Sequence, residues 1–213
     1  GNARLDALLH LIANAQQSLR LAYYIFEADS VGRQIRDDLV AAATRGVAVT
    51  VLVDGFGSSA LPTDFFAPLH AAGASIDQFL PKKGRRYLLR NHQKLLVADE
   101  AKALIGGANI SNEYFQANGS QPGWHDLSLL LEGPQAASLA RYVDALHGWM
   151  RSRRQGIRHL QAVLAASTDH HGPLRWIMGG PFERLNPFAR ALRTDLDTAA
   201  RVDMIQAYFA PDF

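Results

Sequence analysis

His92 and Lys94 are two side chains that could act together, because they lie two positions apart at the start of an apolar run. Side chains along a β-strand alternate between its faces, so both residues would emerge on the same face. The run from Leu95 to Ala98 is apolar throughout, as expected of a strand buried on both faces. We therefore expect an imidazole and an ammonium group to project together from the start of a central strand.

A hairpin after this strand would bring further groups beside the pair. Asp99 ends the apolar run and can turn the chain, and residues 103–105 would return beside the first strand. Gly106 and Gly107 let a ligand approach the backbone closely, and Asn109 offers an amide at the edge of that space. A nucleophile or base, a fixed cation, an open floor and an amide together suit a phosphodiester.

The spacing of these residues resembles the HKD motif of the phospholipase D superfamily. All six fixed positions are matched without a gap, by His92, Lys94, Asp99, Gly106, Gly107 and Asn109. The resemblance implies that His92 attacks phosphorus to form a phosphohistidine, while Lys94 and Asn109 hold the nonbridging oxygens. The family uses two such motifs per active site, so a second histidine would protonate the leaving oxygen, and this chain has no second HxK. For Asp99, at the turn, we expect a structural ion pair.

Asp126 precedes the predicted strand 127–131, at the place where the same family carries a carboxylate that hydrogen-bonds the catalytic histidine. A carboxylate on one ring nitrogen fixes the tautomer and leaves the other nitrogen basic. The resemblance therefore implies that Asp126 orients His92, and simple solvation of a strand edge is the alternative. We expect no metal and no cofactor, because no cluster of residues has ligand-like spacing.

Apolar patterns around the motif predict an α/β fold. Helical stripes and β-branched runs alternate in β-α-β order, which favours a largely parallel sheet with helices on both faces. The predicted strands are 19–26, 47–53, 74–79, 95–98, 103–105 and 127–131, and the predicted helices are 3–18, 32–45, 63–72 and 133–150. We predict a phospholipase D-like lobe with a mostly parallel central sheet in an α-β-α sandwich.

The sequence signal for residues at the rim of the predicted site is less specific than the signal of the HKD motif. Ligands of such sheets bind at the carboxyl ends of the strands, where Asp29 and Asp54 lie, although either carboxylate can instead cap a loop or helix. Cardiolipin synthases of the phospholipase D type often carry Asp before Gly at a similar position, which favours Asp29. Arg90 ends a basic stretch before the motif, and we assign Arg90 and Gly107 to substrate binding, with a solvated loop as the alternative.

Composition sets few limits on function. The chain has 213 residues, 48% of them hydrophobic, with a net charge of +2 and no cysteine. No run of about 18 apolar residues is present, so no membrane span is predicted. Disulfides and thiolate metal sites are excluded, and the small net charge does not select a polyanionic partner.

The pattern of the first residues returns near the end of the chain. A helix is predicted over 187–200 and a strand over 202–209, and the strand sequence resembles that of 19–26. We therefore predict a first lobe with the HKD motif over 1–185 and the start of a second, truncated lobe over 186–213. The sequence then corresponds to the first half of a two-lobe enzyme.

Within the superfamily, the chain resembles bacterial cardiolipin synthases through residues 23–26, 51–58, 90–94 and 124–126. The resemblance implies a membrane-associated phosphatidyl transferase or phospholipase D that uses a phosphatidylglycerol-like lipid at a membrane surface. A second HKD lobe in cis, or a second subunit, would complete the site, and we expect this chain alone to be inactive. Gln93 and His125 stand where a basic residue is usual, which leaves the donor lipid open.

Two alternatives remain open. A phosphodiesterase or nuclease of the same superfamily would use the same residues on nucleic acid and complete its site by dimerisation. It ranks second because little aromatic surface for base stacking accompanies the basic stretch. The chain could also be a non-catalytic half that only binds anions.

Overall fold

The computed structural model describes residues 2–80, 89–115, 123–153, 155–168, 174–178 and 187–203. The chain divides into two compact units, 1–163 and 164–213. The first unit carries the sheet and the candidate site. The lobe boundary between residues 185 and 186 stays a prediction.

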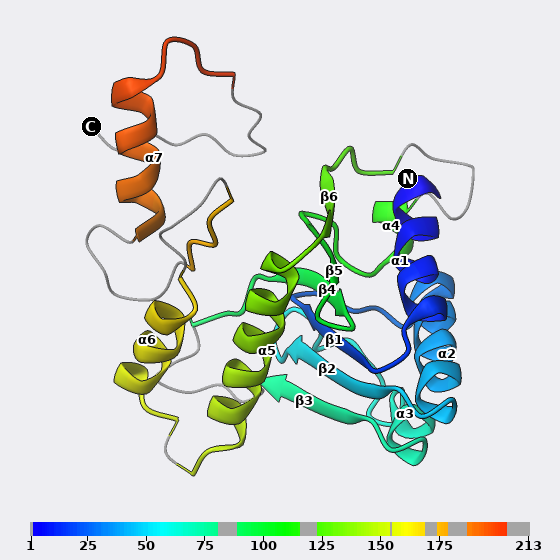
Figure 1. Cartoon of the computed structure of the whole chain (residues 1–213). Helices are drawn as coiled ribbons and strands as arrows, with labels where there is room; N and C mark the ends of the chain where they lie inside the picture. Colours follow the sequence, from blue (N-terminus) through cyan, green and yellow to red (C-terminus); the bar gives the residue numbers. More distant parts are fainter. Residues whose placement is uncertain are drawn as a thin grey trace. The chain divides into compact units, whose positions relative to one another are not determined.

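A six-stranded sheet forms the centre of the first unit, in the order β3-β2-β1-β4-β5-β6 (Figure 1). Its strands are β1 (Ser18–Tyr23), β2 (Ala48–Asp54), β3 (Ser75–Phe79), β4 (Lys94–Ala98), β5 (Lys102–Gly106) and β6 (Ser128–Glu132). The predicted α/β class is confirmed. The three pairings that involve β4, β5 and β6 are antiparallel, while β1 pairs with β2 and β2 with β3 in parallel. The sheet is therefore mixed, and the prediction of a mostly parallel sheet is corrected.

A short connection explains the antiparallel pairing of β4 with β5. Parallel pairing requires a crossover of a dozen or more residues, whereas only residues 99–101 join β4 to β5. Asp99 and Glu100 turn the chain there in the left-handed region, with φ of 53° and 56°. Such a short connection permits only a hairpin.

Helices cover both faces of the sheet, as predicted (Figure 1). One face carries α1 (Asn2–Asn14), α2 (Ser30–Thr44), α3 (Ala67–Ala71) and α4 (Asn112–Phe115), and the other carries α5 (Gln135–Arg151). The main core lies under the first group, where Leu8, Ile12, Ile35 and Leu39 meet alternate strand residues such as Leu21. Because both faces are covered, β4 is buried along its whole length, including Lys94.

Two further helices complete the described chain. α6 spans Ile157–Ala166, and α7 spans Pro187–Thr198 in the second unit, where a helix was predicted. The strand predicted over 202–209 lies almost entirely outside the described residues. Among the helices that the structure describes, none combines the length and apolar composition required to cross a bilayer.

Asp99 fastens the β4–β5 turn to the segment between α1 and β1. Its carboxylate accepts hydrogen bonds from the backbone N–H groups of Gln16, Gln17 and Ser18, at 2.9, 2.7 and 2.8 Å. Partial burial pushes the pKa of Asp99 upward, but these three hydrogen bonds outweigh it, so the pKa lies below its usual value. Backbone amides therefore take the place of the ion pair that we predicted.

We expect Asp99→Asn to lower the free energy of unfolding by about 1–3 kcal/mol at neutral pH, because an amide offers a weaker, single acceptor oxygen. The pKa of Asp99 is lower in the folded state than in the unfolded state. The stabilisation is therefore present above about pH 4 and is lost as the pH falls through the folded pKa. Urea unfolding at several pH values measures both effects.

Asp37→Asn is the matched control, because Asp37 is exposed and pairs with the neighbouring Arg36. We expect it to change the free energy of unfolding by less than about 0.5 kcal/mol. A loss for Asp99→Asn no larger than that of the control at neutral pH would contradict the assignment.

Candidate active site

His92 and Lys94 meet at the end of β4 that lies beside the carboxyl end of β1. Lys94 is in register with Tyr23, and its Nζ lies 3.1 Å from His92 Nδ1 and 2.9 Å from the His92 carbonyl oxygen. Lys94 is only 8% exposed, whereas His92 faces solvent. The structure thus brings the two side chains together, with the ammonium buried and the imidazole accessible.

Burial governs the protonation of both groups. Loss of hydration lowers the pKa of Lys94 from 10.5 to about 8, and the carboxylates of Asp126 and Asp54 oppose this shift. Burial and then the charge of Lys94 lower the pKa of His92, while Asp54 raises it. At neutral pH the pair is therefore an ammonium beside a neutral imidazole. An ammonium can only donate, so His92 Nδ1 accepts and the ring proton resides on Nε2.

Tyr24 also contacts the pair, although the sequence alone indicated no role for it in the site. Its ring centroid lies 4.3 Å from that of His92, and Lys94 Nζ lies 5.2 Å from the same ring. An aromatic face attracts a cation, which offsets part of the desolvation of the ammonium. The Tyr24 N–H donates to the Gln93 carbonyl at 2.9 Å, and Ser58 Oγ donates to the Tyr24 carbonyl at 3.0 Å. These contacts fix the backbone from which the Tyr24 ring projects.

Asn109 is 3% exposed, and both ends of its amide are engaged. Oδ1 accepts from the Ile25 N–H at 3.1 Å, and Nδ2 donates to the Tyr114 hydroxyl at 2.8 Å. Asn109 therefore ties the chain after β1 to the loop after β5. Its predicted hydrogen bond to phosphate stays a prediction.

The glycine pair allows β6 to approach closely. A Cβ on Gly106 would lie 2.5 Å from Ser128 Oγ, and a Cβ on Gly107 would lie 2.5 Å from Asp126 Oδ1. Any side chain there would push these groups away. The open floor that the sequence indicated is thus filled partly by polar groups from the start of β6.

Asp126 lies at the exposed rim of the site. Its carboxylate accepts from the Leu127 N–H at 2.6 Å, and its charge acts on Lys94. Within the described part of the chain, no hydrogen bond joins Asp126 to His92, whose Nδ1 is taken by Lys94. The orientation of His92 by Asp126 therefore stays a prediction.

The other predicted site residues make structural contacts. Asp29 is the N-cap of α2, and it accepts from the backbone N–H groups of Gly32 and Asn112. Arg90 packs over the Phe56 ring at 5.3 Å, and its guanidinium lies 3.8 Å from the carboxylate of Asp54. Asp99 sits at the opposite end of β4 from His92. Substrate binding by Asp29 and Arg90 stays a prediction.

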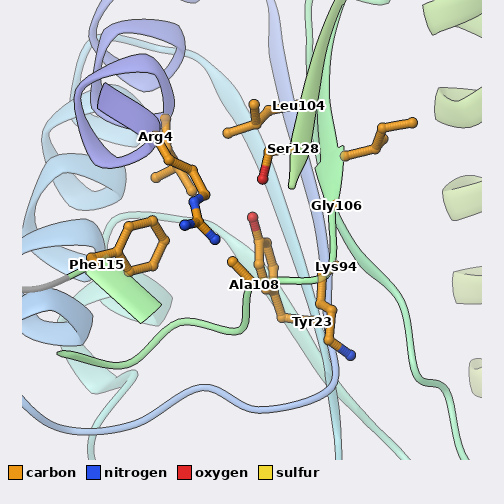
Figure 2. Close-up of a pocket in the computed structure, with 10 residues that line it drawn as sticks. Arg4, Tyr23, Lys94, Leu104, Gly106, Ala108, Phe115 and Ser128 are labelled. Carbon is orange, nitrogen blue, oxygen red and sulfur yellow. The ribbon is translucent and has the colours of Figure 1, made fainter. Parts of the chain in front are cut away.

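A small pocket adjoins Lys94 on the α1 side of the sheet (Figure 2). Arg4, Tyr23, Lys94 and Ser128 line it together with apolar side chains, and no acidic residue does. Figure 2 shows the Arg4 guanidinium and the Tyr23 hydroxyl pointing toward each other. Arg4 Nη1 is buried with no hydrogen-bond partner among the described residues. Burial raises the pKa of Tyr23, and the positive charge of Arg4 opposes this shift.

Acidic and imidazole side chains do not gather into a metal site in the part of the chain that the structure describes. No group of three or more His, Cys, Asp or Glu residues is placed there to hold a metal ion.

Comparison with known proteins identifies relatives for most of the chain. Residues 8–122, more than half of its length, match a family model described as "Cardiolipin synthase, PLD-like domain". The chain is 30% identical to the major cardiolipin synthase ClsA of Bacillus subtilis, covering 100% of this chain and 45% of that protein. It is 33% identical to cardiolipin synthase A of Pseudomonas entomophila, covering 100% of this chain and 44% of that protein. The chain thus spans less than half the length of these relatives.

Solved structures share the fold at low sequence identity. A phosphatidylserine synthase from Haemophilus influenzae matches with a TM-score of 0.56 and 15% identity, over 76% of this chain and 40% of that one. Nuc, a phospholipase D family member from Salmonella typhimurium, matches with a TM-score of 0.50 and 21% identity, over 70% of this chain and 90% of that one. The α/β lobe is therefore a phospholipase D-like fold.

We expect Lys94→Met to raise the pKa of His92, because the substitution removes a cation 3.1 Å from Nδ1. The pKa should stay below 6.5, since burial of the ring remains. NMR titration of the His92 ring measures the change. Lys102→Met is the control: Lys102 is half-exposed at the far end of β5 and pairs with Glu132. A His92 pKa that does not rise in Lys94→Met, or that rises equally in the control, would refute the coupling.

A second prediction concerns Gly57. A Cβ at this position would collide with the Tyr24 carbonyl oxygen and approach its ring atoms to 2.9 Å. We expect Gly57→Ala to cost about 1–3 kcal/mol of unfolding free energy and to shift the His92 ring resonances, because Tyr24 must move. Gly148→Ala in α5 is the control, since nothing lies within 4 Å of its Cβ, and it should stabilise by about 0.5–1 kcal/mol. Equal urea midpoints for the two variants would contradict this.

Proposed function

Because the chain belongs to the cardiolipin synthase family of phospholipase D-like domains, we propose that it forms one lobe of a phosphatidyl transferase acting on phospholipid phosphodiesters. One observation carries this proposal. A solvent-facing imidazole lies 3.1 Å from a buried ammonium, on the motif of a family named for cardiolipin synthesis. Such a pair supplies a nucleophile and a fixed positive charge for a phosphate anion.

In the proposed reaction, a ring nitrogen of His92 attacks phosphorus and the bond from phosphorus to the leaving oxygen breaks. The leaving oxygen takes a proton from an acid on a second lobe, and a phosphohistidine remains. An acceptor alcohol then attacks the same phosphorus, loses its proton to that lobe and releases His92. The covalent intermediate allows transfer to an alcohol as well as to water.

Substrate binding would also prepare the nucleophile. In the free site, Lys94 donates to Nδ1, so Nε2 carries the ring proton and has no lone pair for attack. A phosphate oxygen is a charged acceptor and competes with Nδ1 for the ammonium. Once Lys94 turns to the phosphate, the ring proton can move to Nδ1, where Asp126 would accept it in a hydrogen bond. Nε2 then holds the attacking lone pair.

The acid would come from a second HKD lobe. The curated relatives are more than twice as long as the part that this chain matches. In the second unit, Leu192 and Leu196 lie one turn apart on α7 and are exposed, an apolar stripe typical of a helix that packs on a sheet. We propose that residues 186–213 open a second lobe in cis, with completion by a second subunit as the alternative. The substrate would be a phosphatidylglycerol-like lipid at a bacterial membrane surface.

A lipid assay tests the proposed function. The complete gene product, including any sequence beyond this chain, is incubated with phosphatidylglycerol vesicles, and products are identified by mass spectrometry. We expect a phosphatidyl-transfer product, and we expect His92→Ala to reduce its rate by at least about a thousandfold, because the nucleophile is removed.

His10→Ala is the control for loss of an imidazole, since His10 is exposed on α1 away from the motif, and it should keep wild-type turnover. This chain alone should form no product. A lipid profile unchanged by His92→Ala, or salt-sensitive DNA cleavage in place of lipid turnover, would overturn the proposal.

A further inference from the structure

We propose that Asp54 is a positioning residue for the reacting pair, which fastens the residue before His92 to the loop after β2 and places a buried negative charge near His92 and Lys94. This inference rests on the proposed role of His92 and Lys94 in catalysis. Asp54 is not part of the HKD motif and lies on a different strand, β2.

The carboxylate of Asp54 is buried and accepts three backbone hydrogen bonds. Asp54 is the last residue of β2 and is 0% exposed. Oδ1 accepts from the N–H groups of Phe56 and Gly57 at 2.9 and 3.0 Å. Oδ2 accepts from the N–H of Asn91 at 2.9 Å. One side chain therefore joins the loop after β2 to the residue that directly precedes His92.

Two sets of contacts connect Asp54 to the imidazole of His92. Asn91 is 6% exposed, and fixing its N–H fixes the backbone from which His92 projects. On the other side, Gly57 packs so closely on Tyr24 that a Cβ would collide with its carbonyl oxygen, and the Tyr24 ring lies 4.3 Å from that of His92. Asp54 therefore holds both the backbone and the ring surface that position the imidazole.

The charge of Asp54 also acts on both members of the pair. Among the described residues, the charged groups that act on the pair are Lys94 itself, Asp126 at the rim and the buried Asp54, and Arg90 lies 3.8 Å from Asp54. The negative charge of Asp54 raises the pKa of both His92 and Lys94, against the effect of burial. A buried carboxylate is costly unless its lone pairs are satisfied, and here three N–H donors and Arg90 serve this need. Asparagine could not replace it, because its NH₂ group would face a backbone N–H.

Asp99 offers a matched comparison. Its carboxylate also accepts from three backbone N–H groups, but at the opposite end of β4. Asp99 is not among the charges that shift the pKa of His92 or Lys94. Removing either charge should weaken a turn, and only the loss of Asp54 should alter the titration of the pair.

NMR titration of this chain tests the inference without requiring turnover. In Asp54→Asn, we expect the pKa values of His92 and Lys94 both to fall by about 0.5–1, because a buried carboxylate near a cation raises its pKa by such amounts or more. In Asp99→Asn, both pKa values should match the wild type while the melting temperature falls. Unchanged titration of His92 and Lys94 in a folded Asp54→Asn variant would overturn the inference.

A measurement on the wild type covers the case in which Asp54→Asn does not fold. The ¹³Cγ resonance of Asp54 should shift with pH with an inflection at the His92 midpoint, and His92→Ala should abolish this inflection. The Asp99 ¹³Cγ should lack that inflection. An Asp54 resonance with no inflection at the His92 midpoint would refute the charge coupling. Failure of the lipid assay would leave these titrations unaffected, so the two proposals fail separately.

Discussion

The ammonium of Lys94 is buried against the imidazole of His92, and most features of the surrounding structure offset the cost of that contact. Removing an ammonium from water is expensive, and a neighbouring base would normally compete for its proton. The His92 carbonyl accepts from Nζ at 2.9 Å, the Tyr24 ring lies 5.2 Å away, and the charges of Asp54 and Asp126 favour the protonated lysine. Even so, the pKa of Lys94 falls to about 8, which still leaves it charged at neutral pH.

The mixed orientation of the strands brings Lys94, Tyr24 and Asp54 to the same end of the sheet. β4 runs antiparallel to β1, so its first residue lies beside the last residue of β1, with Lys94 in register with Tyr23. β2 is parallel to β1, so Asp54, its last residue, lies at the same end of the strands as the carboxyl end of β1. In a wholly parallel sheet, the start of β4 would lie at the opposite end of the strands, away from Tyr24 and Asp54. The antiparallel pairing of β4 with β1, which the sequence did not predict, is therefore required to bring the site residues together.

Local patterns predicted most of the elements and the reacting pair, because both depend on neighbours in sequence. The apolar run 95–98 was sufficient to predict β4, and the spacing of His92 and Lys94 was sufficient to predict that these two side chains meet at its start. Contacts between distant segments escaped prediction. Nothing near Asp54 in the sequence indicates that it accepts from Asn91, and nothing near Asp99 indicates that it accepts from Gln17.

Asn109 makes structural contacts that its place in the motif did not indicate. Its amide oxygen accepts from Ile25 and its amide nitrogen donates to Tyr114, while its hydrogen bond to phosphate stays a prediction. Under the proposed function, the phosphate is then selected by Lys94, whose hydrogen bond to Nδ1 keeps His92 in the tautomer that cannot attack through Nε2. A phosphodiester anion offers the ammonium a stronger, charged acceptor than the ring nitrogen, whereas a neutral ester does not. Because Lys94 is 8% exposed, salt screens this exchange only weakly, and activation of the nucleophile depends on the charge of the substrate.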